Sequence, residues 1–207
     1  MPHTTHPHVK SLGLPENSKV ILSTHPVLAH KLTKLRDAKT DANLFRHLLR
    51  EITFYLGYGI PSTTMRPPFL YPDANGDAAI GMYRNSNSLL PVQYYNKLPK
   101  ECHIDCAIVL EPLINTAGTI IATVAILKVW GVSQIKIIST IASKDGLKDL
   151  FAKHPDVEVI VAAIDDTLSE SGVIVPGLGD AGDRQFDTDV HHISENGGNH
   201  KRKHSEE

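Results

Sequence analysis

One short stretch of the chain, EPLINTAGT at residues 111–119, combines residue types that suit binding of a phosphorylated sugar. The apolar run Ala107–Leu110 ends at the acidic Glu111, and a turn of small and hydroxyl-bearing residues then leads into a helical pattern. Small residues let the backbone approach a ligand closely, and the first N–H groups of a helix have no partners within the helix. The dipole of that helix also favours an anion.

The residues of this stretch suit two different chemical groups of a ligand. The hydroxyls of Thr116 and Thr119, with the backbone around Ala117 and Gly118, suit a phosphate. Glu111 has the wrong charge for a phosphate but suits sugar hydroxyls, or a Mg²⁺ reached through water. The stretch is not a P-loop, because the G-x-x-x-x-G-K-[ST] pattern is absent from it. A phosphorylated ribose is therefore the predicted ligand, and the alternative is an ordinary capped turn with an incidental acid.

A second stretch, VIVPGLGDAGDR at residues 173–184, contains Gly177, Gly179 and Gly182 in the G-x-G-x-x-G spacing. A dinucleotide site requires that spacing to open a helix within a βαβ unit, with an acid on a later strand. Here the polar sequence DRQFDTD follows instead. We therefore predict a tight loop whose exposed backbone reads a flat heterocycle, with Asp180 nearby. A plain surface loop is the alternative.

The elements that position these stretches follow from the hydrophobic pattern. Apolar residues at spacings of three and four predict two helices within Val27–Tyr55, and Thr40 and Asp41 are candidate caps for the second. Strands and helices then alternate, strand first, over residues 107–110, 119–130, 134–142, 144–153 and 157–164. This order predicts an α/β fold with a parallel sheet covered by helices on both faces. Ligands of such sheets bind beyond the carboxyl ends of the strands.

Changes in composition predict the domain boundaries. Residues 1–18 are expected to form a flexible leader, 19–186 a single domain and 187–207 a disordered polar tail. Residues 57–76 hold four prolines and three glycines, and are predicted to be irregular.

The length, net charge and hydrophobic pattern of the chain exclude several classes of protein. A length of 207 residues suits one domain, and a net charge of -2 gives no bulk attraction to nucleic acid or to an anionic membrane. No apolar run approaches the roughly 20 residues of a membrane helix, and no secretory signal is visible. Cys102 and Cys106 are expected to be free thiols in a reducing compartment. We therefore expect a cytoplasmic protein with no nucleic-acid or membrane partner.

Together these stretches resemble the uracil phosphoribosyltransferases, a branch of the type I phosphoribosyltransferases. The phosphoribosyl-pyrophosphate (PRPP) loop of that family typically reads DPMLATGGS, where this chain has EPLINTAGT. Its uracil loop typically reads GYIVPGLGDAGDR, where this chain has GVIVPGLGDAGDR. Other similar stretches are HPVLAHKLTKLRD at 25–37, GMYRN at 81–85, LPVQYYNKLP at 90–99 and HPDVEVIVAAID at 154–165. The resemblance covers nearly all of residues 25–186.

The resemblance implies a type I phosphoribosyltransferase-like sheet with N-terminal helices, and the conversion of uracil and PRPP to UMP and diphosphate. Mg²⁺ would bind with the diphosphate of the substrate and have no direct protein ligands. The implied PRPP-binding residues are Arg84, Glu111, Pro112, Leu113, Ile114, Asn115, Thr116, Ala117, Gly118, Thr119 and Asp180. The implied uracil-binding residues are Ile174, Gly179, Asp180 and Ala181, acting mainly through backbone groups.

More specific roles also follow from the resemblance. Thr116–Thr119 would hold the 5′-phosphate and Glu111 would contact the ribose hydroxyls. The catalytic residues would be Asp180, which lies between base and ribosyl donor, and Arg84, which faces the pyrophosphate. A homo-oligomer is implied as well, as is the GTP activation known for some members.

The chain departs from the family pattern in one main place. The family carries an apolar strand that leads to an ILRAG-type loop, whose arginine binds the pyrophosphate. Only 21 residues lie between Gly59 and Gly81 here, and no continuous apolar strand can be read in them. Arg66 is a candidate substitute for that arginine, although Pro67 and Pro68 follow it. The sheet is therefore expected to lack one family strand, which would leave unpaired backbone and apolar surface.

Smaller departures lie in the two loops. Asn115 and Ala117 replace the usual Ala and Gly, Val173 replaces a Tyr, and Glu111 is one methylene longer than the usual Asp. Three hypotheses stay open: an active enzyme, a catalytically impaired relative that serves as a nucleotide-binding or regulatory subunit, and a sequence shortened by gene prediction or splicing. The nearly intact uracil loop favours the enzyme.

Overall fold

A parallel sheet of four strands forms the centre of the molecule. The computed structural model describes residues 12–58, 80–84 and 91–188, without the side chains of residues 83 and 84. Within these residues the strand order is β1-β6-β5-β4, and all three pairings are parallel. The bounds are Lys19–Leu22 for β1, Cys106–Ile114 for β4, Gln134–Ser143 for β5 and Glu158–Asp165 for β6. The predicted α/β fold with a parallel sheet is therefore confirmed.

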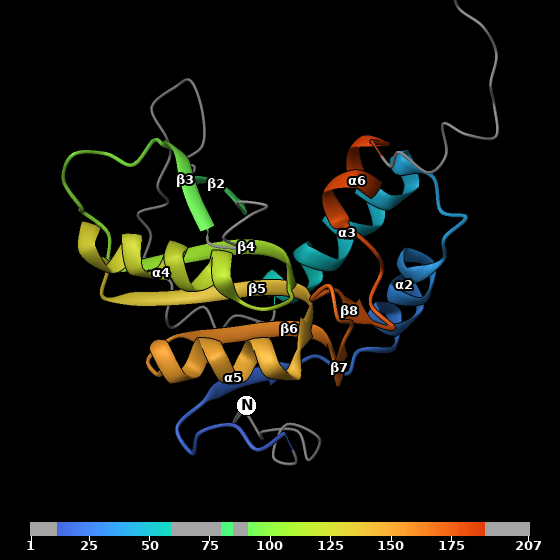
Figure 1. Ribbon diagram of the computed structural model, residues 1–207, viewed down its shortest axis with the longest axis horizontal. Coiled ribbons are helices and arrows are strands. Elements are labelled where there is room, and N and C mark those ends of the chain that lie inside the picture. Colours follow the sequence, from blue (N-terminus) through green and yellow to red (C-terminus); the bar gives the residue numbers. More distant parts are fainter. Residues whose placement is uncertain (1–11, 59–79, 85–90, 189–207) are drawn as a thin grey trace, which may run out of the picture.

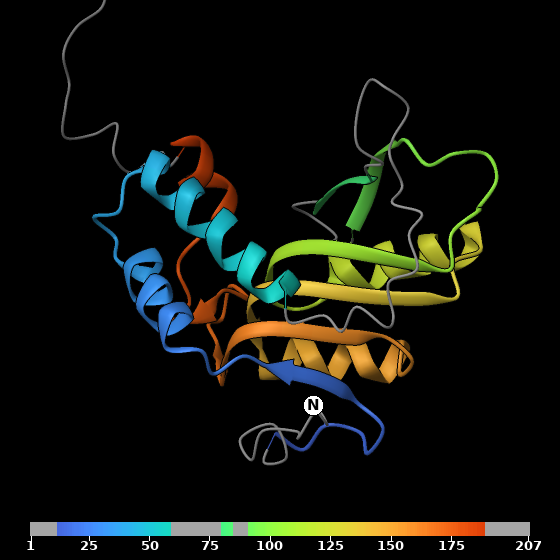
Figure 2. The same cartoon turned by 180° about the vertical axis from the view of Figure 1, so that it is seen from behind.

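Helices pack on both faces of this sheet (Figures 1 and 2). Their bounds are Pro26–Arg36 for α2, Ala42–Tyr58 for α3, Gly118–Trp130 for α4, Lys144–Lys153 for α5 and Ala181–Phe186 for α6. One buried cluster joins α4 and α5 to one face, and a second joins α2, α3 and α6 to the other. Figure 1 shows the carboxyl ends of β5 and β6 pointing toward α2 and α3. The candidate ligand-binding edge therefore lies between these two helical layers.

Large side chains in these clusters are almost completely buried. Val124 and Phe151 lie with Ile137 in the first cluster, and Phe45 and Ile160 lie in the second. Burial of one such side chain contributes roughly 1.5–3 kcal/mol to folding. Both helical layers are thus fixed to the sheet by apolar packing.

Two short antiparallel pairs that the sequence does not predict accompany the main sheet. The first pairs β2 (Ile80–Arg84) with β3 (Pro91–Asn96), and the second pairs β7 (Thr167–Leu168) with β8 (Ile174–Val175). The register of the first shifts at Gly81, where an added Cβ would lie 2.7 Å from the ring of Tyr94. A glycine at this position lets the hairpin close.

The predicted helix boundaries agree with the structure to within a few residues. Asp41 caps α3, since its Oδ1 accepts a hydrogen bond of 2.9 Å from the N–H of Leu44. Thr40 instead closes the end of α2, because its hydroxyl donates to the carbonyl of Lys34 over 2.6 Å. Gly131 ends α4 in the left-handed conformation at φ 116°.

The predicted end of β4 is wrong. The strand continues past Leu110 through Glu111 to Ile114, pairing only with β5 among the described strands. Pro112 is compatible with this position, because a proline in an edge strand removes no hydrogen bond when its nitrogen faces outward. The predicted burial of residues 107–110 holds for Ala107 but not for the whole strand, since Ile108 is 42% exposed and Leu110 61%.

The predicted domain boundaries need two adjustments. Leu12 lies within the predicted leader but is only 1% exposed and packs in the core, so ordered packing starts before residue 19. Tyr58 still belongs to α3, although the irregular stretch was predicted from residue 57. The remaining parts of that stretch and of the leader and tail, residues 59–76, 1–11 and 189–207, lie outside the described residues. None of the helices in the described part has both the length and the hydrophobicity of a membrane span.

The cap at Asp41 gives a stability prediction. Asp41→Ala should lower the free energy of unfolding by about 1 kcal/mol, because the first turn of α3 loses its acceptor. Asp41→Ser keeps an acceptor and should lose clearly less. Urea denaturation of both variants measures the difference, and equal losses would contradict the capping role.

Candidate active site

A cavity of about 480 Å³ opens at the carboxyl end of β4, where the sequence predicts the ligand. The first predicted stretch lines it from Glu111 to Thr119, and the second contributes Val173, Asp180, Ala181 and Gly182. The other lining residues are Pro91, Ile120, Ser171, Gly172 and Gln185. Two stretches that lie far apart in the sequence therefore share one cavity.

The N-terminus of α4 lines this cavity without a capping side chain. Its N-cap is Ala117, which makes no side-chain hydrogen bond. The other described helices are capped by His25, Asp41, Ser143 and Asp180. The first N–H groups of α4 thus lack the partner that each of these helices has, and they suit an anionic ligand.

Ala117 also holds an unusual backbone conformation. Its φ is 57°, in the left-handed region, which costs an L-residue with a side chain roughly 1–2 kcal/mol. Its methyl group is buried in the core cluster on the α4 side of the sheet. Packing therefore holds a turn that the local backbone preference opposes.

The turn before α4 is held by the first turn of α5. The Ser143 hydroxyl donates to the carbonyl of Asn115 over 2.5 Å and accepts from the N–H of Gly146 over 2.8 Å. A Cβ added at Gly146 would lie 2.2 Å from that same Asn115 carbonyl oxygen. Only a glycine lets α5 come this close, so the position of the turn depends on residues 143 and 146.

Glu111 is the acidic group of the cavity wall. Burial raises its pKa to about 7, against a smaller lowering effect of the hydrogen bond from the Leu113 backbone. None of the ion pairs among the described residues includes Glu111. The carboxyl group therefore titrates near neutral pH and suits a partner that the ligand supplies, such as sugar hydroxyls.

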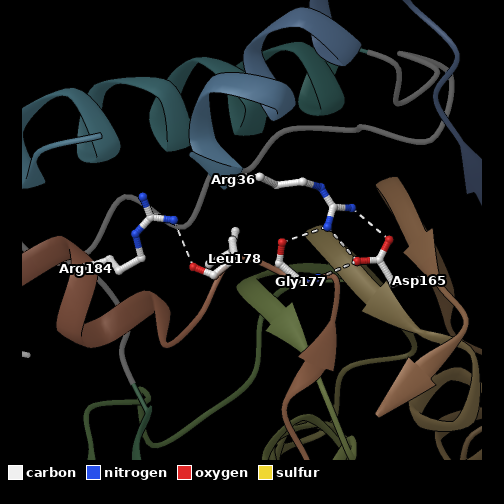
Figure 3. Close-up of polar contacts among 5 residues, drawn as sticks. All are labelled: Arg36, Asp165, Gly177, Leu178 and Arg184. Carbon is white, nitrogen blue, oxygen red and sulfur yellow. Dashed lines mark hydrogen bonds and ion pairs between the residues drawn. The ribbon is translucent and has the colours of Figure 1, made fainter. Parts of the chain in front are cut away.

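The second stretch forms a loop that is held by Arg36, at the end of α2 (Figure 3). Its guanidinium binds both carboxylate oxygens of Asp165 over 2.7 and 2.8 Å, and donates to the carbonyl of Gly177 over 2.7 Å. Asp165 also accepts from the N–H of Gly177 over 3.0 Å. Both backbone groups of Gly177 are therefore bound by this ion pair.

Arg184, on α6, holds the next residue of the loop (Figure 3). One nitrogen donates to the carbonyls of Leu178 over 2.9 Å and of Leu35 over 2.7 Å, and the other donates to that of Asp37 over 2.6 Å. The guanidinium carbon lies 4.5 Å from the centre of the Phe45 ring. Burial lowers the pKa of Arg184, while Asp37 opposes that effect.

Two residues predicted for the site lie outside the described wall of this cavity. Ile174 is 3% exposed and packs in the core, and Gly179 lines a second cavity of about 540 Å³ beside Arg36 and Arg184. A third predicted residue, Arg84, ends β2, and its side chain lies outside the described part. The described residues contain no group of three or more His, Cys, Asp or Glu arranged to hold a metal ion.

The residues that hold the two loops were missed from the sequence. Ser143 stands directly before the predicted helix at 144–153, so its capping role could have been inferred. Arg36 and Asp165 are 129 positions apart, and no local pattern pairs them.

Comparisons with known proteins agree with this geometry. A profile of the uracil phosphoribosyltransferase family matches residues 70–188, more than half of the chain. The uracil phosphoribosyltransferase of Roseiflexus sp. (strain RS-1) is 39% identical, with 83% of this chain and 99% of the relative covered. That of Dictyoglomus turgidum is 38% identical, with 82% and 99% covered. The chain belongs to the uracil phosphoribosyltransferase family.

A solved member of the same fold supports the architecture. The structure of the AQ2163 protein from Aquifex aeolicus superposes with a TM-score of 0.70 at 25% identity, covering 83% of this chain and 99% of that one. The match therefore extends over almost the whole of the Aquifex chain.

The coverage also shows how much of a relative's sequence has no counterpart in this chain. The match to the Roseiflexus protein extends over 206 positions, whereas 83% of 207 residues is about 172. About 34 residues of that relative thus have no counterpart here. That number is large enough to include the strand and the ILRAG-type loop that the sequence is predicted to lack.

The close approach of α5 gives a second prediction. Gly146→Ala should lower the free energy of unfolding by about 1–3 kcal/mol, because the new methyl group meets the Asn115 carbonyl. Gly118→Ala is the matched control. Gly118 follows the turn that contains Asn115, and a Cβ there meets no atom within 4 Å. Urea denaturation of both variants compares them, and an equally destabilised control would contradict the proposed contact.

The pKa of Glu111 gives a third prediction. The pKa is raised to about 7 from an ordinary 4.5, so the folded protein binds more protons than the unfolded chain between these values. The group therefore makes folding less favourable as pH rises through this window. Glu111→Gln should raise the free energy of unfolding by about 3 kcal/mol at pH 8 and by less than about 1 kcal/mol at pH 5. Denaturation at both pH values measures this, and a gain independent of pH would be the contrary result.

Proposed function

We propose that this chain is a uracil phosphoribosyltransferase, which converts uracil and PRPP to UMP and diphosphate in pyrimidine salvage. The observation that carries the proposal is that the PRPP-loop and uracil-loop stretches line one cavity. The names of the Roseiflexus and Dictyoglomus relatives support the same activity.

The ribosyl donor would bind along the first stretch. The uncapped N-terminus of α4 and the residues Thr116–Thr119 offer N–H and hydroxyl donors to the 5′-phosphate. Glu111 would accept hydrogen bonds from the ribose hydroxyls. Since burial raises its pKa to about 7, these hydroxyls would replace part of the hydration that the carboxylate has lost.

Uracil would bind against the second stretch. The proposed contacts are backbone groups of Ile174, Gly179 and Ala181, as in the family pattern. Asp180 lines the same cavity as the PRPP-loop stretch, which suits a position between base and donor. Because backbone groups have fixed directions, such a loop can distinguish one heterocycle from another only if it is held rigidly.

In the proposed reaction the bond from the anomeric carbon to the diphosphate oxygen breaks and a bond to N1 of uracil forms, with release of the N1 proton. The anomeric carbon becomes oxocarbenium-like, so alignment and stabilisation of charge supply the catalysis. The carboxylate of Asp180 would stabilise the positive sugar, and Arg84 would face the leaving diphosphate. No protein nucleophile is required.

Magnesium fits this site as an ion that arrives with the substrate. The cavity offers the carboxylates of Glu111 and Asp180, which would reach the ion through water. Mg²⁺ is commonly bound through one or two carboxylates together with substrate phosphates. When bound, it would neutralise charge on the diphosphate.

The remaining properties rest on the family resemblance. A homo-oligomer is proposed, and the exposed Ile108 and Leu110 on β4 are compatible with one. A cytoplasmic location is supported by the free thiols of Cys102 and Cys106. Activation by GTP, known for some members, is proposed from the family resemblance, and no residue of this chain is assigned to it.

A second candidate function is a catalytically impaired relative that binds nucleotides or regulates a partner. Two observations favour it: about 34 residues of the Roseiflexus relative have no counterpart here, and no Lys or Arg is among the described residues that line the cavity. Arg66 and the side chain of Arg84 lie outside the described part. Loss of one charged contact to the diphosphate would cost several kcal/mol of transition-state stabilisation.

The purified 207-residue chain should form UMP from uracil, PRPP and Mg²⁺. Asp180→Asn should lower kcat/KM by about 100-fold, because the charge is lost at the proposed reaction centre. The Asn variant is preferable to Ala, since its side-chain oxygen can still cap α6 through the N–H of Asp183.

Asp183→Asn is the matched control, since Asp183 lies on the same short helix and outside the wall of the active-site cavity. It should retain nearly full activity. If the folded wild-type chain binds PRPP but forms no UMP, the second candidate function, a catalytically impaired nucleotide-binding relative, is favoured over the enzyme.

A further inference from the structure

We infer that Arg36 is a positioning residue for the nucleobase, which sets the affinity for uracil by fixing the backbone of residues 177–179 without touching the base. The inference rests on the proposed function for the identity of the ligand. The contact itself is independent of that assignment, because it joins α2 and β6 to the loop in the ligand-free protein.

The ion pair binds the loop at two adjoining peptide groups. Asp165 accepts from the N–H of Gly177 over 3.0 Å, and Arg36 donates to the carbonyl of that residue over 2.7 Å. A Cβ at Gly177 would lie 2.1 Å from the carbonyl oxygen of Ile174, so the loop folds back closely on its own strand here. The peptide planes on both sides of Gly177 are therefore fixed.

Arg184 fixes the next peptide plane from a different helix. It donates to the carbonyl of Leu178, which belongs to the same peptide group as the N–H of Gly179. In a trans peptide these two groups point in opposite directions. The N–H of Gly179 is consequently turned away from Arg184, and its direction is set before any ligand binds.

The chemistry of the contact requires an arginine at position 36. A planar guanidinium can bind two carboxylate oxygens and one carbonyl at once, whereas a lysine offers a single point charge. Asp165 is 8% exposed, so its charge depends on a protein partner. Arg36 also ends α2, where the helix dipole favours a positive charge.

The phosphate-binding turn has its own separate support. Ser143 and Gly146 hold the Asn115 carbonyl from α5, on the opposite face of the sheet from α2. Loosening of the loop at Gly177 should therefore weaken binding of the base much more than binding of the ribosyl donor. A general loss of stability would not separate the two substrates in this way.

The test compares Arg36→Lys with Lys31→Met. Lys31 lies on the same helix and forms a partly buried ion pair of 2.6 Å with Glu51 on α3, away from the loop. Arg36→Lys should raise the KM for uracil about tenfold, as expected for a lost charge-assisted hydrogen bond, and leave the KM for PRPP within about twofold. Lys31→Met should lower stability and leave both KM values within about twofold.

Hydrogen exchange supplies a second readout that needs no activity. The amide of Gly177 and its neighbours in residues 174–180 should exchange about tenfold faster in Arg36→Lys than in Lys31→Met. Equal shifts of both KM values, unchanged KM values, or equal exchange in the two variants would overturn the inference. If the wild-type chain forms no UMP, the proposed function fails, and exchange alone decides whether Arg36 fixes the loop.

Discussion

The backbone register of three parallel strands is the constraint on which the site depends. Ile114 of β4 pairs with Ala142 of β5, and Ser143 of β5 pairs with Asp165 of β6. The three strands therefore end at nearly the same level. The groups at the ends of β5 and β6 then hold one loop each: the Ser143 hydroxyl donates to the Asn115 carbonyl, and the Asp165 carboxylate accepts from the N–H of Gly177. The candidate active site is thus a consequence of strand pairing combined with two short buried contacts.

Several features of the cavity wall lower the stability of the folded protein when no ligand is bound. α4 starts without a capping side chain, Ala117 is held in the left-handed region, and burial raises the pKa of Glu111 to about 7. Each feature costs stability in the free protein, and each lies on one wall of one cavity. Such features gather where a ligand is expected to provide the missing partner. The surrounding apolar layers supply the stability that allows this.

Much of the fold and part of the candidate site could be predicted from the sequence. Period-3.6 patterns gave the helices, and the isoleucine-rich run at Gln134 indicated the buried strand β5, because these signals are local. β4 was predicted too short, since a proline and an acid normally end a buried strand but are tolerated at an edge. The pairing of Arg36 with Asp165 could not be predicted, because it depends on how α2 crosses the end of β6. The exposure of Leu110 could not be predicted either, because it depends on the position of β4 at an edge of the described sheet.

The missing family segment affects the site unevenly. Of the two edges of the described sheet, β4 is the one that exposes large apolar side chains, Ile108 and Leu110, and we expect the predicted missing strand to belong beside it. The anchors of both loops come instead from β5, β6, α2, α5 and α6. If the predicted shortening lies near that edge, the turn at residues 115–118 and the loop at residues 173–180 keep their supports. The cost would then fall on the third part of the proposed reaction, the charge of the departing diphosphate, since no Lys or Arg is among the described residues of the cavity wall.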